Sequence, residues 1–340
     1  MHLFHDALVS FAERWVISMR KLVAIGEALI DFAPETIGAP IKEVEAFAPK
    51  VGGAPANVCG AYVKLGGEAV MLTQLGNDPF GDKIVEELLA EGIDVSYIIR
   101  TDQANTSLAF VALKENGDRE FSFYRKPGAD MLYQPKDVKE SVFQDAYALH
   151  FCSVSLGNYP MKEAHVQAIQ YAKKANAIIS FDPNLRKQLW ESEEDLKKAV
   201  LEFLPQVDIL KLSDEEVEFV TGKENLEDAL EALFDLGITV VILTLGGDGA
   251  MVYTKQTKAK QPGVEVSPVD TTGAGDGFIG SLLYQLAESE KSLEDMSTMP
   301  EEEWESYLRF SNIFCGESVQ KQGAIASYPT MQEMQQLCRR

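Results

Sequence analysis

Residues 269–283 read VDTTGAGDGFIGSLL, and three glycines, Gly273, Gly275 and Gly277, stand directly before an apolar helical run. The backbone N–H groups of such a turn and of the first helical turn converge on one point. The positive end of the helix dipole adds to their effect. The sequence therefore predicts an anion site that needs no basic side chain.

Asp276 lies among these donors. A carboxylate held ionised there accepts a proton from an alcohol, while the adjacent N–H groups stabilise charge on a phosphoryl group in transfer. The alternative is an Asp that only caps the helix. Gly275, Gly277 and Gly280 also match the dinucleotide pattern GxGxxG. No strand ending in an acidic residue follows about twenty residues on, so a dinucleotide-dependent oxidoreductase is kept only as an alternative of another class.

A second glycine-rich stretch, residues 51–67, reads VGGAPANVCGAYVKLGG. Gly52 and Gly53 permit close approach of a ligand to the backbone, and Asn57 presents an amide that suits sugar hydroxyls. A tight strand-to-helix turn with Asn57 facing solvent is the alternative. Asp31, in GEALIDF, follows an apolar strand and either accepts bonds from paired hydroxyls or simply ends the strand.

Two shorter segments suit a nucleotide or a phosphate. Residues 243–249, LTLGGDG, predict a strand that runs into an open glycine-rich turn, although a simple hairpin would look the same. Residues 182–186, DPNLR, supply an amide and a guanidinium that can bind phosphate or substrate oxygens. A surface pair between Arg186 and a carboxylate is the alternative.

The order of elements predicts the fold class. Apolar runs bounded by turn residues alternate with amphipathic stretches, as in β-α units around a mostly parallel sheet. The expected strands are residues 22–25, 69–75, 148–152, 177–181, 209–212, 240–244 and 250–253. The expected helices are residues 56–65, 82–91, 160–174, 192–203, 215–221, 226–236, 276–287 and 304–319.

Two segments break this order. Residues 33–51 are rich in proline and lack a helical period, and residues 106–133 alternate with period two around Asn116-Gly117, a hairpin signal. Strands that do not feed helices predict a small separate sheet, which would cover one edge of the main domain as a lid.

Composition excludes several classes of protein. The 340 residues carry 31 Lys and Arg against 53 Asp and Glu, and a net charge of -22 has the wrong sign for nucleic acid or an anionic membrane. Four scattered cysteines and four histidines show neither CxxC nor HExxH spacing, which indicates reduced thiols in the cytoplasm and argues against a zinc site. The apolar runs fall short of a membrane span. Residues 1–18 lack the features of a signal peptide and are an extension without an assigned function.

The two glycine motifs in this order, with GEALIDF, FYRKPGAD and FDPNLRKQLW, make the chain resemble the ribokinase-like (pfkB-type) carbohydrate kinases, most of all the fructokinases. The resemblance runs from about residue 19 to 330. It implies a Rossmann-like three-layer α/β/α fold, with the kinase domain in residues 19–32, 52–105 and 134–340 and the β lid in residues 33–51 and 106–133. It also implies transfer of the γ-phosphoryl group of MgATP to fructose, with 2-keto-3-deoxygluconate or another sugar or nucleoside as the alternative.

The same resemblance implies roles for particular residues. Asp276 would be the catalytic base, and the amides of Gly273, Ala274, Gly275 and Asp276 the anion hole. The sugar would be held by Asp31, Gly52, Gly53, Asn57, Arg125 on the lid strand, and Arg186. The nucleotide and its magnesium would be contacted by Ser213, Glu216, Thr244, Gly246, Gly249 and Asn312, although Ser213 replaces the Asn of the family's N-x-x-E motif.

Members of this family often bind a monovalent cation beside the anion hole, so potassium is expected. The matching positions, which would act largely through backbone carbonyls, are Asp270, Thr272, Ser318, Lys321, Gly323 and Ser327. Lys321 would alternatively place its own ammonium there. An apolar edge or face of the lid would be covered in a homodimer.

Overall fold

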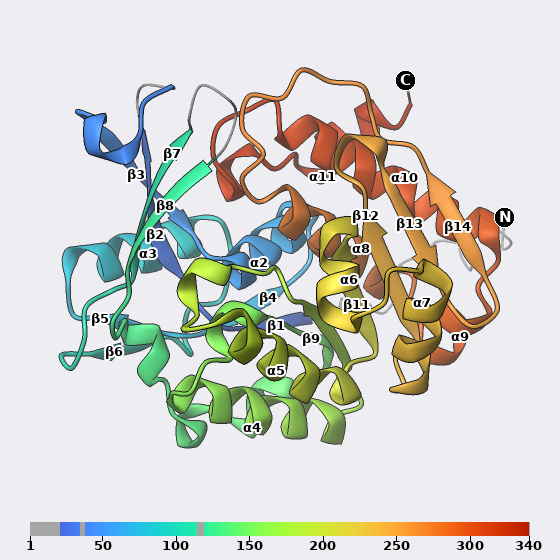
Figure 1. Ribbon diagram of the computed structural model, residues 1–340, viewed down its shortest axis with the longest axis horizontal. Coiled ribbons are helices and arrows are strands. Elements are labelled where there is room, and N and C mark those ends of the chain that lie inside the picture. Colours follow the sequence, from blue (N-terminus) through green and yellow to red (C-terminus); the bar gives the residue numbers. More distant parts are fainter. Residues whose placement is uncertain (1–20, 35–37, 114–118, 340) are drawn as a thin grey trace, which may run out of the picture.

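The computed structural model describes residues 21–34, 38–113 and 119–339. The main sheet contains β1 (Lys21–Ile25), β4 (Ala69–Leu72), β9 (Ala146–Cys152), β10 (Ile178–Asp182), β11 (Ile209–Ser213), β12 (Val240–Thr244), β13 (Ala250–Tyr253) and β14 (Lys258–Gln261). Its eight strands lie in the order β14-β13-β12-β11-β10-β9-β1-β4 (Figure 1). The first six of them along the chain are parallel, and β13 and β14 pair antiparallel at one edge.

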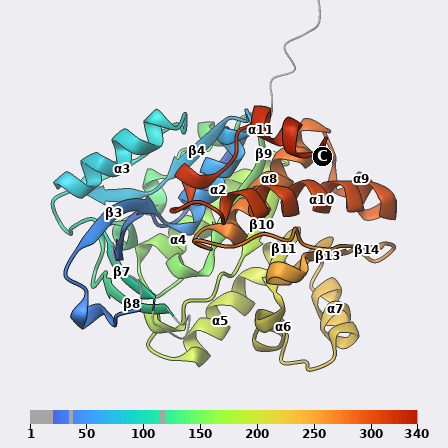
Figure 2. The ribbon, with the colours of Figure 1, turned by 90° about the horizontal axis from the view of Figure 1, so that it is seen from above.

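Helices cover both faces of this sheet, because its strands are apolar on both faces. In β1, Leu22 and Ala24 belong to one core, and Val23 and Ile25 to the other. The first core is covered by α2 (Ala54–Lys64), α3 (Pro79–Ala90), α8 (Ala274–Glu288), α9 (Leu293–Thr298), α10 (Glu301–Ser318) and α11 (Met331–Leu337). The second is covered by α4 (Pro160–Lys174), α5 (Glu193–Phe203), α6 (Asp214–Thr221) and α7 (Leu226–Asp235) (Figure 2). The expected three-layer α/β/α fold is confirmed.

A second sheet stands at the left of Figure 1 and contains β2 (Leu29–Pro34), β3 (Phe47–Gly52), β7 (Leu108–Leu113) and β8 (Arg119–Tyr124). Its order is β3-β2-β7-β8, so the small sheet expected from the sequence is present. β2 already begins at Leu29, so Asp31 lies inside a strand of the small sheet and not after a strand of the main domain. The domain boundary expected at residue 32 therefore falls within β2. Arg125 lies one residue beyond β8.

The hairpin expected in residues 106–133 is confirmed by the antiparallel pairing of β7 with β8, which brings Leu113 opposite Arg119. Its turn, Asn116-Gly117, lies outside the described residues, as does the extension 1–18. The expected strand 69–75 is divided into β4 and β5 (Gln74–Gly76), and β5 pairs with β6 (Ile99–Thr101) in a sheet of its own.

Short 3-10 helices fill many connections. They are η1 (Ile41–Glu43), η2 (Ala129–Leu132), η3 (Pro135–Asp137), η4 (Glu140–Phe143), η5 (Ser153–Ser155), η6 (Lys187–Leu189), η7 (Leu204–Gln206), η8 (Gly246–Asp248) and η9 (Ile325–Ser327). Within the described part of the chain, no helix has the length and apolar character needed to cross a membrane.

Candidate active site

Asp276 stands in the first turn of α8, and its position depends on Gly273. Gly273 is the N-cap with φ 74°, and a Cβ there would lie 2.6 Å from the Cβ of Ala324. Only glycine therefore fits the turn that opens the helix. Amides in the first turn of a helix have no intrahelical acceptor and remain available to an anion. Ala274 is the least available of the expected donors, because its N–H already donates to the Thr271 carbonyl over 3.3 Å.

Two amide side chains hold the carboxylate of Asp276. Asn57 Nδ2 on α2 donates to Oδ2 over 2.9 Å, and Asn184 Nδ2 beyond β10 donates to Oδ1 over 3.2 Å. Asn57 is 4% exposed, so the alternative in which it faces solvent is wrong. Segments 219 and 92 residues away along the chain thus meet at one side chain.

The glycines of the GxGxxG pattern serve helix packing. A Cβ on Gly280 would lie 2.8 Å from the Val58 carbonyl oxygen of α2, and one on Gly277 would lie 2.9 Å from the Tyr328 ring. Both glycines lie inside α8 and not in a phosphate-binding turn. The pattern therefore does not support a dinucleotide site.

Burial raises the pKa of Asp276 to about 6, an effect that the hydrogen bond from Asn57 opposes. The pKa of Asp31 is raised to about 7, again mainly by desolvation, while Arg186 lowers it and Asp276 raises it. A Cβ on Gly52 would lie 2.1 Å from Asp31 Oδ2, and one on Gly53 would lie 2.5 Å from the Glu27 carbonyl oxygen. The expected sugar residues of the small sheet and of α2 therefore gather beside the expected base.

The two arginines differ in their surroundings. Arg186 influences the pKa of both Asp31 and Asp276, and its Nη1 donates to the Leu185 carbonyl over 3.0 Å. Arg125 is buried and forms an ion pair with Asp130 through Nε, at 2.9 Å, and through Nη2. Its remaining donors point to Val154 O, Ser155 Oγ and the Tyr159 hydroxyl. The guanidinium of Arg125 is thus engaged by protein atoms, so the geometry does not support the expected sugar contact.

The expected nucleotide residues gather between β12, β14 and α10. Thr244 ends β12, and Gly246 and Gly249 bound the following turn. A Cβ on Gly249 would lie 2.1 Å from the Gln261 carbonyl oxygen. Asn312 donates to the carbonyls of Gln261 and Pro262 over 3.2 and 2.9 Å, so its amide nitrogen fixes that loop.

Glu216 links the carboxyl ends of two neighbouring strands. Its Oε2 accepts from the Ser213 N–H over 2.9 Å, and its Oε1 accepts from the Leu185 N–H over 2.8 Å. The carboxylate is therefore fixed in place through backbone amides and does not depend on the side chain of Ser213.

The residues expected to bind a cation lie in two segments, residues 270–272 and residues 318–327. The side chain of Asp270 connects the two segments. Its Oδ1 accepts from the Thr272 N–H over 2.9 Å, and its Oδ2 accepts from the Gly323 N–H over 2.9 Å. Lys321 pairs with Glu317 at 2.9 Å, so its ammonium is directed to α10. The hydroxyls of Ser318 and Ser327 bond carbonyls three residues earlier. In the described segments, no group of three or more His, Cys, Asp or Glu side chains could hold a metal ion.

Sequence reasoning missed the roles of Asp182 and Lys211 near Asp276. Asp182 and Lys211 form a 2.7 Å ion pair with side chains 1% and 6% exposed. A Cβ on Gly275 would lie 3.2 Å from Lys211 Nζ, so this ammonium lies beneath the expected anion hole. The signal was a lysine inside the apolar strand ILKLS. Asn184 supplies the amide expected from the DPNLR segment, but its partner Asp276 was not predicted.

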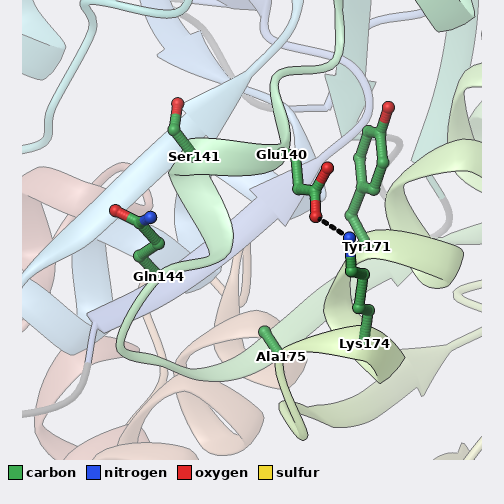
Figure 3. Close-up of a pocket in the computed structure, with 6 residues that line it drawn as sticks. All are labelled: Glu140, Ser141, Gln144, Tyr171, Lys174 and Ala175. Atoms are coloured by element: carbon green, nitrogen blue, oxygen red, sulfur yellow. Dashed lines mark hydrogen bonds and ion pairs between the residues drawn. The ribbon is translucent and has the colours of Figure 1, made fainter.

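A surface hollow of about 430 Å³ between η4 and α4 has no connection with these residues (Figure 3). Its two charges, Glu140 and Lys174, neutralise each other in an ion pair. It offers no converging donors and shares no residue with the site around Asp276.

A buried carboxylate beside first-turn amides, with nucleotide-compatible loops nearby, is the arrangement of a phosphotransferase that acts on a hydroxyl group. The family model for pfkB family carbohydrate kinases matches residues 19–331. Fructokinase-1 of Oryza sativa subsp. japonica is 38% identical over 317 residues, which are 93% of this chain and 97% of that protein.

Solved structures agree with this relationship. The fructokinase of Xylella fastidiosa with bound ATP is 31% identical, with a TM-score of 0.84 over 94% of this chain and 98% of that one. A double mutant of the fructokinase of Vibrio cholerae O395, with fructose, ADP and a potassium ion bound, is 32% identical, with a TM-score of 0.84 over 94% and 98%. The chain belongs to the pfkB family of carbohydrate kinases. It is a phosphotransferase with an alcohol group as acceptor.

Proposed function

We propose that the protein is a fructokinase, which transfers the γ-phosphoryl group of ATP to D-fructose and releases fructose 6-phosphate and ADP. The observation that carries this proposal is the position of Asp276 between the first turn of α8 and the two amides of Asn57 and Asn184. The fructokinases among the relatives support the choice of sugar.

In this proposal Asp276 accepts the proton of the terminal sugar hydroxyl as the oxygen attacks the γ-phosphorus. The amides that follow Gly273 stabilise the negative charge on the phosphoryl oxygens. Asp31, the backbone at Gly52 and Gly53, and Asn57 orient the sugar. Closure of the lid excludes water, which would otherwise hydrolyse ATP.

Magnesium would bind together with ATP, because the bound ion neutralises charge on the phosphates. Glu216 fits a magnesium that keeps its waters, because the carboxylate is fixed between the carboxyl ends of β10 and β11. Potassium is proposed for the carbonyls of the two segments that Asp270 connects, as a stabiliser of the turn before α8.

The charges around the site favour a neutral sugar over 2-keto-3-deoxygluconate. A carboxylate on the substrate needs a cationic partner. Arg125 is neutralised by Asp130, and Arg186 lies in the field of two carboxylates, Asp31 and Asp276. An acidic sugar would therefore meet net negative charge.

The test is release of ADP in a coupled assay with fructose, ribose, adenosine and 2-keto-3-deoxygluconate, each with and without potassium. We expect fructose to give the highest kcat/KM, with a product phosphorylated at the terminal hydroxyl by ³¹P NMR, and potassium to increase the rate. A higher kcat/KM for 2-keto-3-deoxygluconate would contradict the assignment of the sugar.

We also propose that the small sheet is the lid and that two copies meet through it. On the sheet face opposite Asp31, the ring of Phe110 stacks on Phe32 at 4.6 Å and meets Tyr124 at 5.4 Å, and Tyr124 is 64% exposed. The test is the mass in solution, which should correspond to a dimer and fall to that of a monomer in Tyr124→Asp.

We propose a cytoplasmic location because all four cysteines are free thiols, and cell fractionation would test it.

A further inference from the structure

A chain of polar contacts leads from the interior of the main sheet to Asp276. Lys211 Nζ donates to Asp182 Oδ2 over 2.7 Å, the Asn184 N–H donates to Asp182 Oδ1 over 3.1 Å, and Asn184 Nδ2 donates to Asp276 Oδ1 over 3.2 Å. We propose that Asn184, held by the buried pair Asp182–Lys211, is a positioning residue for the catalytic base. This inference rests on the proposed function and deepens it.

The backbone at Asn184 shows that the turn is built for this contact. Its φ is 45°, in the left-handed region that few residues other than glycine, Asn and Asp adopt. Pro183 precedes it, and the carboxylate of Asp182 accepts its N–H. The turn therefore directs the amide of residue 184 from the carboxyl end of β10 to the first turn of α8.

The ion pair beneath this turn is costly to bury, and an apolar pair of the same size often stabilises a fold as well. Its place at the end of β10 and in the middle of β11 gives it a geometric role, since it fixes the carboxylate that accepts from Asn184. Each oxygen of Asp276 then receives one amide hydrogen, Oδ2 from Asn57 and Oδ1 from Asn184. The two bonds define the plane of the carboxylate and favour its ionised form.

Several groups on other elements also act on Asp276 and must be considered in any pH experiment. The charged or ionisable groups coupled to it are Asp31 on β2, Cys152 on β9, Asp182 on β10, Arg186, Lys211 on β11, Cys315 on α10 and Tyr328. Burial keeps Cys152, Cys315 and Tyr328 neutral at ordinary pH. These two thiols and the phenol therefore do not contribute to the acidic side of the rate profile.

The experiment uses Asn184→Gly and Asn184→Asp. Glycine keeps the left-handed backbone and removes only the amide, while aspartate keeps the shape and replaces the donor with a negative charge. We expect kcat with fructose to fall roughly ten- to a hundredfold in Asn184→Gly, as the loss of a hydrogen bond to a charged group implies. In both variants the acidic limb of the kcat profile should move to higher pH, with the larger shift in Asn184→Asp, while KM for ATP changes little.

The matched controls are Asn176→Gly and Asn176→Asp. Asn176 is exposed, has φ 58° and lies in the turn after α4. Its substitutions should leave the rate and the pH profile unchanged. A circular dichroism melt of each variant checks that the fold is retained.

An acidic limb at the same pH in wild type and both Asn184 variants would overturn the inference, and so would an equal fall in rate at every pH. Other results would contradict the proposed function itself. These are a wild-type enzyme without fructose-dependent release of ADP, or an Asp276→Asn variant with full activity. An active wild type with an inactive Asp276→Asn variant and unshifted Asn184 variants would contradict the positioning role alone.

Discussion

At the scale of single residues, the site depends on how burial and charge act on two carboxylates. Burial and Asp276 on α8 raise the pKa of Asp31 on β2, and burial together with Asp182 raises the pKa of Asp276. Arg186 and Lys211 oppose this effect for Asp276. The pKa of Asp276 therefore lies close to pH 7 and above that of a free carboxylate. At pH 7 this side chain is ionised and is also basic enough to take a proton.

This electrostatic arrangement predicts an acidic limb in the rate profile. The pKa of Asp276 is raised to about 6 and that of Asp31 to about 7, and both act as acceptors only when ionised. We therefore expect kcat/KM for fructose to decline below about pH 7 and more steeply below about pH 6. A stopped-flow profile checks this, and Asp31→Asn should remove the upper part of the decline. A flat profile down to pH 4.5 would contradict the assignment of both residues.

At the scale of elements, the approach of α2 to α8 brings Asn57 to Asp276. Gly280 permits this approach, because a Cβ there would meet the backbone of Val58 at 2.8 Å and cannot move aside. Gly280→Ala should therefore reduce the free energy of unfolding by about 1–3 kcal/mol, as overpacking does. Gly247→Ala is the control, since nothing lies within 4 Å of its Cβ position. Equal urea midpoints for the two variants would show that the helices do not need this glycine.

The helices and strands expected from the sequence agree with the structure where the hydrophobic periodicity is strong. Elements with weak periodicity were missed or given wrong bounds. The ends of β12, β13 and α4 agree with the expected ranges. β14, with the sequence KAKQ, and α9, with LEDMST, are too short and polar to stand out. The expected helix 82–91 begins earlier, at Pro79, because the side chain of Asp78 caps it.

Among the site residues, those in glycine motifs were predictable because their spacing carries backbone geometry. Asp276, Gly273, Gly52 and Asn57 all lie where the two motifs place them. Partners supplied from distant segments were not predictable. The pairing of Arg125 with Asp130 and the path from Lys211 to Asn184 depend on how strands and loops meet in three dimensions.

At the scale of the whole molecule, Arg125 is the point at which the proposed lid joins the kinase domain. It follows β8, pairs with Asp130 of η2, and bonds the Val154 carbonyl in η5 beyond β9. Gln74 of β5 adds a bond to the Ala129 carbonyl over 3.0 Å. The buried pair therefore belongs to the contacts that connect the proposed lid to the main domain.

Removing one partner of this pair should destabilise the protein strongly. Asp130→Ala leaves the guanidinium of Arg125 buried without its counter-ion, at a cost of about 3–5 kcal/mol. Glu193→Ala breaks the exposed pair with Lys187 and should cost less than about 1 kcal/mol. Urea unfolding measures both. Similar losses in the two variants would mean that the buried pair does not anchor the lid.

The most direct test of the catalytic role of Asp276 is the fructose-dependent rate of ADP release by Asp276→Asn, which keeps the size of the side chain and removes its basicity. We predict that kcat falls by roughly 10²–10⁴, the range of general-base catalysis, while the affinity for ATP measured by calorimetry is retained. A variant that turns over fructose at the wild-type rate would contradict the role assigned to this carboxylate.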